Sequence, residues 1–146
     1  MAYMVGILLA MSVSLCARMV GLDRDRAFYP TVLVVVVSCY DLFGVMGGSM
    51  QALLAEASVT VVFLIAVVIG FKRNLWIIAA ALLAHGMFDS IHARLIPNPG
   101  VPDWWPLFCL AYDATAALIL AGLLWNGSGR GAMLDAHARA LPNSNG

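Results

Sequence analysis

Residues 75–95 read LWIIAAALLAHGMFDSIHARL, an apolar run that ends among three ionisable side chains. These are His85, Asp89 and His92, and their i, i+4, i+7 spacing places them on one face of a helix. The run has about the 20 residues that a helix needs to cross the hydrocarbon of a bilayer. The stretch therefore predicts a membrane helix with a polar face in its second half.

The composition of the whole chain is that of an integral membrane protein. Of its 146 residues, 62% are hydrophobic and 11% are charged, whereas a soluble domain has about 25% charged residues. The mean hydropathy is +0.90. Zero net charge and the lack of a basic cluster argue against a nucleic-acid partner. The three cysteines are too widely spaced for a disulfide framework or a CxxC metal site.

Apolar segments near the length of a membrane span recur along the chain and predict an all-α bundle of five transmembrane helices. We expect these helices at residues 2–17, 29–46, 50–70, 75–95 and 107–125. Residues 1–125 would form one transmembrane domain. The remaining residues, 126–146, are rich in Gly, Ser and Asn and are expected to form a flexible cytoplasmic tail.

The basic residues predict how the bundle is oriented. Seven of the eight lie in alternate connections or after the last helix, at Arg18, Arg24, Arg26, Lys72, Arg73, Arg130 and Arg139. The other set of connections holds only Arg94. Because cytoplasmic loops are enriched in Lys and Arg, we expect the N-terminus outside and the C-terminus in the cytoplasm. The expected location is a bacterial-type inner membrane, spanned several times.

Four carboxylates and two histidines fall inside the predicted helices, at Asp41, Glu56, His85, Asp89, His92 and Asp113. A charge near the bilayer centre costs roughly 2.5–3.5 kcal/mol on insertion scales, so such residues are candidates for function. At a rise of about 1.5 Å per residue, all six fall in the outer half of the membrane. One polar pocket that opens outward would hold all of them away from lipid.

The residue types in this pocket suit a divalent metal. His85, Asp89 and His92 would supply two imidazoles and a carboxylate from one rigid helix, a suitable ligand set for Zn²⁺. Asp113 would complete the set or orient a histidine from outside it. Glu56 or Asp41 would then act as the general base toward a metal-bound water.

Other interpretations of the same residues stay open. Glu56 lies in an early turn of its helix, where the helix dipole favours a carboxylate, and Asp41 could instead cap nearby backbone. The leading hypothesis is a metal-dependent membrane hydrolase whose amphiphilic substrate comes from the bilayer or the outer aqueous face. The sequence is also compatible with a homo-oligomer. The alternatives are a proton- or metal-coupled transporter or relay, and a non-catalytic protein with a metal-sensing or structural role.

Three motifs carry a resemblance to a known family. HGMFDSIH at 85–92, NPGVPDWWPLFC at 98–109 and AYD at 111–113 resemble small bacterial and fungal integral membrane proteins of unknown function. That family has a His-x3-Asp-x2-His helix, a Pro-containing outer loop and a Cys-x3-Asp motif, here Cys109 and Asp113. The resemblance covers about residues 75–120. Relatives often have a second histidine where this chain has Ala93. The resemblance implies a shared pocket but names no reaction.

Overall fold

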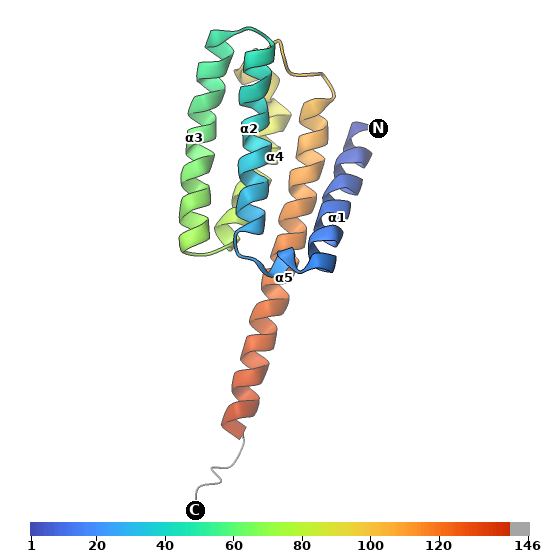
Figure 1. Ribbon diagram of the computed structural model, residues 1–146, viewed down its shortest axis with the longest axis vertical. Coiled ribbons are helices and arrows are strands. Elements are labelled where there is room, and N and C mark those ends of the chain that lie inside the picture. The colour runs from blue at the N-terminus through green and yellow to red at the C-terminus, as the bar shows by residue number, and fades with distance from the viewer. Residues whose placement is uncertain (141–146) are drawn as a thin grey trace, which may run out of the picture.

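The chain forms an all-α bundle in the computed structural model, which describes residues 1–140 and the side chains of residues 1–127. Five helices are long and apolar enough to cross a membrane, as the sequence predicts (Figure 1). They are α1 (Ala2–Val20), α2 (Phe28–Met46), α3 (Met50–Lys72), α4 (Trp76–Leu95) and α5 (Trp105–Ala140), with a 3-10 helix η1 (Leu22–Arg24) after α1.

The helix boundaries agree with the predicted ones to within about three residues, except at the end of α5. The membrane-length part of α5 is Trp105–Gly127, but the helix continues to Ala140 and projects beyond the bundle (Figure 1). The predicted tail, 126–146, therefore begins inside a helix. Residues 141–146 lie outside the described residues, and the predicted flexibility and cytoplasmic location of the tail stay predictions.

Each of the five helices packs against particular neighbours in the bundle. The most extensive contacts join α4 to α5, α1 to α5 and α2 to α3, and α3 also packs on α4. Helix α1 lies at one side of the bundle, beside α5 (Figure 1). Its Gly6 permits this approach, since an added Cβ would lie 3.1 Å from the backbone nitrogen of Tyr112. Helix α1 therefore packs on the bundle without entering its centre.

The apolar core occupies one end of the bundle. Its largest fully buried members are Leu33, Ile78, Leu82 and Leu120, which lie near the α1–α2 and α3–α4 connections. We call this the basic end, because those connections or their edges carry Arg18, Arg24, Arg26, Lys72 and Arg73. Only 17% of α1 and 11% of α3 is buried over their membrane-length windows. Their exposed apolar faces suit contact with lipid.

The opposite end, here the loop end, holds the α2–α3 turn at 47–49 and the α4–α5 loop at 96–104 (Figure 1). The loop rests closely on the last turn of α2. An added Cβ on Gly47 would lie 2.6 Å from the backbone nitrogen of Gly100, and one on Gly100 would overlap the carbonyl oxygen of Phe43. This contact fixes the loop over the end of the bundle where the polar residues gather.

Candidate metal centre

Three carboxylates and two histidines are buried in the described part of the bundle, each at most 2% exposed: Glu56, His85, Asp89, His92 and Asp113. They lie in the half of their helices toward the loop end, since His85 is at the middle of α4 and the others lie nearer that end. The apolar core fills the other half. These five residues therefore share one half of the bundle, as the sequence predicts.

Three of the predicted metal ligands form one cluster, the triad His85–Asp89–Asp113. The ligand atoms of these residues all lie within 4.8 Å of one another. His85 Nδ1 is 2.6 Å from Asp113 Oδ2 and 3.5 Å from Asp89 Oδ2. His85 and Asp89 share a face of α4 because they are four residues apart. Asp113 reaches the same point from α5.

A glycine brings Asp113 within reach of α4. At Gly86, next to His85, an added Cβ would lie 3.2 Å from Asp113 Cβ and 3.2 Å from the carbonyl oxygen of Leu110. Helices α4 and α5 therefore cross at a separation that leaves no comfortable space for a side chain at this position. Because the two helices cross so closely, Asp113 on α5 joins His85 and Asp89 on α4 in one site.

The charges of the triad are not balanced within the protein. Asp89 Oδ1, Asp89 Oδ2 and Asp113 Oδ1 are buried and have no hydrogen-bond partner. Two ionised carboxylates beside one histidine carry a net charge of −1 or −2, depending on the imidazole. Burying such a charge away from water costs several kcal/mol for each ion that stays uncompensated. The triad thus calls for a positive charge, supplied by protons or by a cation.

A divalent ion fits both the charge and the ligand atoms. Two carboxylates and a neutral imidazole around an M²⁺ ion sum to zero. In a tetrahedral zinc site with bonds of about 2.0–2.1 Å, ligand atoms lie about 3.4 Å apart. The Asp89–His85 separation of 3.5 Å already meets this value. The His85–Asp113 contact of 2.6 Å would have to open by about 0.8 Å for both to bind, because His85 Nδ1 cannot bind a metal and donate a hydrogen bond to Asp113 at the same time.

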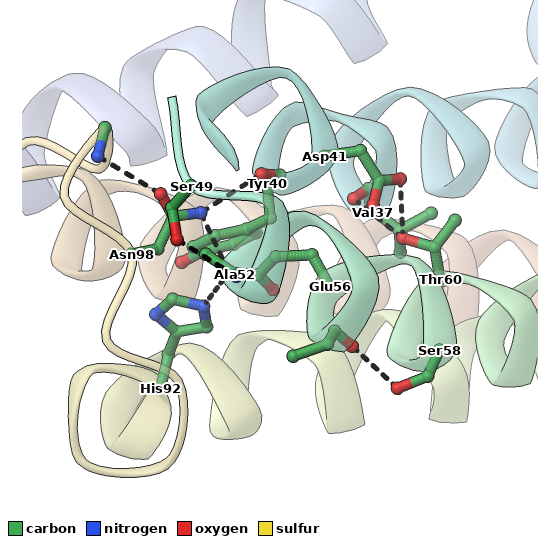
Figure 2. Close-up of polar contacts among 12 residues, drawn as sticks. Val37, Tyr40, Asp41, Ser49, Ala52, Glu56, Ser58, Thr60, His92 and Asn98 are labelled. Carbon is green, nitrogen blue, oxygen red and sulfur yellow. Dashed lines mark hydrogen bonds and ion pairs between the residues drawn. The ribbon is translucent and has the colours of Figure 1, made fainter. Parts of the chain in front are cut away.

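The fourth predicted ligand, His92, lies in a different cluster. Its Nε2 is 2.7 Å from Glu56 Oε1 on α3, and Asn98 Nδ2 in the α4–α5 loop donates to the same oxygen at 3.0 Å (Figure 2). Asn98 Nδ2 also lies 3.3 Å from the carbonyl oxygen of Tyr40. The pair Glu56–His92 can therefore balance its own charge, which distinguishes it from the triad. The structure groups His92 with Glu56 and not with His85.

Tyr40 on α2 lies between the two clusters. Its ring centroid is 4.2 Å from that of His92 and 6.1 Å from that of His85. Its buried hydroxyl interacts electrostatically with the Asp89 carboxylate. Tyr40 is thus the side chain through which the two clusters meet.

Asp41, the second predicted general base, lies apart from both clusters. Its Oδ2 accepts a hydrogen bond of 2.9 Å from Thr60 Oγ1 on α3, as Figure 2 shows. The side chain is only partly buried. Asp41 therefore joins α2 to α3 in this structure, while Glu56 alone of the two candidates contacts another predicted site residue.

A pocket of about 390 Å³ opens at the loop end beside the second cluster. His92 and Asn98 both belong to its lining, together with Ala93, Ile96, Pro97, Pro99, Val101, Pro102, Asp103 and Pro106. The triad is not part of that lining. Access to the buried polar residues from this pocket therefore passes the Glu56–His92 pair first.

Sequence reasoning missed two residues that build these clusters. Asn98 stands between two prolines six residues after His92, so an amide in a stiff loop next to the polar helix end was the available signal. Gly86 follows His85 directly, and a small residue inside a polar helical motif indicates a close helix crossing.

Comparisons with protein-family models, curated proteins and solved structures gave no match. The resemblance of residues 75–120 to a membrane-protein family stays a prediction from its motifs. The function must therefore be argued from the geometry of the two clusters. The described residues form an all-α bundle with five helices long and apolar enough to span a membrane, and its buried His/Asp triad is compatible with a bound metal ion.

Proposed function

We propose that the protein is a metal-dependent membrane hydrolase whose divalent ion is held by His85, Asp89 and Asp113. The observation that carries the proposal is the excess of negative charge in the triad, where three buried carboxylate oxygens have no hydrogen-bond partner. A divalent ion satisfies these oxygens and neutralises the site at once. The nitrogen and oxygen ligands suit Zn²⁺, which binds both at about 2.0–2.2 Å.

The neighbouring cluster suits a role in proton transfer. A metal of this kind lowers the pKa of a bound water and so supplies a hydroxide near neutral pH. Glu56 and His92 form a hydrogen-bonded carboxylate–imidazole pair, the combination that general acid–base catalysis uses most often. Tyr40, which contacts both histidine rings, would separate the metal from this pair until water or substrate joins them.

The orientation proposed from the sequence gives the site an outward position. With the basic end in the cytoplasm, the loop end, its pocket and both clusters would face the outer leaflet. The N-terminus would lie outside, in a bacterial-type inner membrane. An amphiphilic substrate could then place its apolar part in the outer leaflet and its polar part in the 390 Å³ pocket.

The two rival functions are less well supported. A proton relay across the membrane needs polar groups toward the basic end, but that half of the described bundle is filled by Leu33, Ile78, Leu82 and Leu120. A purely structural network would pair its polar atoms, as Glu56 and His92 do. Neither Asp89 oxygen has a hydrogen-bond partner, and Asp89 Oδ2 contacts His85 Nδ1 only as an ion pair at 3.5 Å.

Metal content is the direct test. Protein purified in a non-ionic detergent is analysed by mass spectrometry for bound metals, beside His85→Ala, Asp89→Asn and the control Asp41→Asn. We expect about one equivalent of a divalent metal in the wild type and the control, and loss of metal in both triad variants. A wild type without metal after supplementation with Zn²⁺, Mn²⁺ and Fe²⁺ overturns the proposal.

A second experiment separates binding from catalysis. Glu56→Gln removes the charge of the proposed base and keeps the shape of the side chain. We expect it to retain metal and to lose hydrolysis of any ester or amide amphiphile that the wild type cleaves. Loss of metal in Glu56→Gln would show instead that Glu56 supports the triad.

A further inference from the structure

The pocket at the loop end has an unusual balance of hydrogen-bonding groups. Four of its ten lining residues are prolines, namely Pro97, Pro99, Pro102 and Pro106. A proline has a carbonyl acceptor but no N–H donor. The walls of the pocket therefore offer more acceptors than donors before any other residue is considered.

The remaining donors of the loop are largely used within the protein. The N–H groups of Gly100 and Val101 are bonded to Asn98, and that of Ile96 is bonded to the carbonyl of His92. The side-chain amide of Asn98 donates to Glu56 and to the carbonyl of Tyr40. Among the carbonyl oxygens of the lining, those of Asn98 and Pro102 accept from Val101 and Trp105, whereas those of Pro97 and Pro99 accept no hydrogen bond from the described residues.

The charged groups that line the pocket also favour a hydrogen-bond donor over an acceptor as ligand. Asp103 is exposed at the rim, and His92 in the lining is paired with the Glu56 carboxylate. No lysine or arginine is among the ten lining residues, all of which belong to the described part of the chain. A positively charged donor is therefore favoured in this pocket. An anion is disfavoured both by the excess of acceptors and by the carboxylates of Asp103 and Glu56.

The geometry points to a binding site for a primary ammonium group, carried by a small amine or by the head of an amphiphile, in the pocket lined by His92, Asn98 and Asp103. The volume of about 390 Å³ is within the range of about 300–1,000 Å³ of small-molecule sites. The proline rings supply apolar walls for the methylene groups next to the nitrogen. Binding itself does not require the metal. Only the identification of the amine as the head of a substrate rests on the proposed function.

Titration with three matched probes tests the chemistry of the pocket. The probes are n-butylammonium, n-butanol and n-butyrate, added to metal-free full-length protein in a non-ionic detergent at constant ionic strength. Trp104 and Trp105 directly follow Asp103 in the chain, so their fluorescence reports on the site. We expect saturable binding of butylammonium, with butanol and butyrate at least tenfold weaker. Equal binding of butanol, preferential binding of butyrate, or no saturable binding of butylammonium overturns the inference.

Variants at exposed positions of the pocket add a test that does not disturb the fold. Ala93 is exposed and lines the pocket, so Ala93→Lys should abolish butylammonium binding while the size-matched Ala93→Gln retains most of it. Asp103→Asn should weaken binding about two- to fivefold, the effect of one exposed charge pair. Asp25→Asn, an exposed carboxylate change at the basic end, should have no effect. Equal behaviour of Ala93→Lys and Ala93→Gln would contradict the role of charge.

The outcome distinguishes this site from the metal centre. Butylammonium binding should be the same in Asp89→Asn as in the wild type, because Asp89 is not in the pocket lining. Binding of the amine by a protein that takes up no metal would leave this inference standing and reject the hydrolase. Metal binding without amine binding would do the reverse.

Discussion

Replacement of Asp89 by Asn should change the stability of the protein in opposite directions with and without metal. In the metal-free protein Asp89 is 1% exposed and both of its carboxylate oxygens lack a hydrogen-bond partner. The amide has nearly the same shape and no charge. What remains is the His85–Asp113 pair at 2.6 Å, which can balance its own charge. Removing the unpaired charge should therefore stabilise the metal-free fold.

The size of the two effects follows from burial and from ligand linkage. Replacement of buried charges by neutral groups of similar volume raises the free energy of unfolding by about 1–4 kcal/mol. The new amide lowers this gain, because an unsatisfied buried polar group costs about 1–3 kcal/mol. We expect a net gain of roughly 1–2 kcal/mol in the metal-free variant. A metal at about 1,000 times its Kd stabilises the wild type by about 4 kcal/mol. The variant should then be roughly 2–3 kcal/mol less stable than the metal-loaded wild type.

The free energy of unfolding can be measured by titration with sodium dodecyl sulfate in mixed micelles, followed by far-ultraviolet circular dichroism. Each protein is measured once with a chelator and once with saturating Zn²⁺. Asp41→Asn, whose carboxylate binds Thr60, is the control and should respond to Zn²⁺ like the wild type. If Asp89→Asn is destabilised equally in both conditions, Asp89 acts as a structural acceptor, and the reasoning from its unpaired oxygens is refuted.

Three further substitutions test other parts of the structure. Gly86→Ala should destabilise by about 1–3 kcal/mol, since its Cβ overpacks the α4–α5 crossing, and it should weaken metal binding, measured by competition with a chelating dye. Asn98→Ala should cost about 1–3 kcal/mol of unfolding free energy, because it removes a donor to buried Glu56, while metal content stays unchanged. Leu33→Ala, a cavity in the apolar core, should cost about 2–5 kcal/mol with metal content unchanged, which separates loss of stability from loss of the site.

The helices of this protein could be predicted well from its sequence, for a simple physical reason. A membrane span must satisfy its own backbone and must be apolar over about 20 residues, so length and hydropathy nearly determine it. The ends of α2, α3 and α4 lie within two residues of the predicted ones. The end of α5 was less predictable, because Gly and Ser after Trp125 lower helix propensity without forbidding a helix that continues to Ala140.

The composition of the clusters was less predictable than their location. The spacing of His85, Asp89 and His92 puts all three on one face of α4, but a face extends over about 10 Å between residues seven apart. Which partner each one meets depends on the neighbouring helix at that height. Helix α5 supplies Asp113 at the level of His85, and α3 supplies Glu56 at the level of His92. Such levels are set by helix crossings and loop lengths, which hydropathy does not encode.

The two clusters differ in whether their charges are balanced by their own residues. Glu56 and His92 are satisfied by each other and by Asn98, so they lie next to a pocket without needing a bound ion. The triad is enclosed and carries carboxylate oxygens without hydrogen-bond partners, so protons or a bound cation would stabilise it. In the proposed hydrolase, substrate would reach the Glu56–His92 pair from the pocket, and the metal would lie behind that pair. Tyr40, in ring contact with both histidines, is then the side chain whose movement would connect the two clusters.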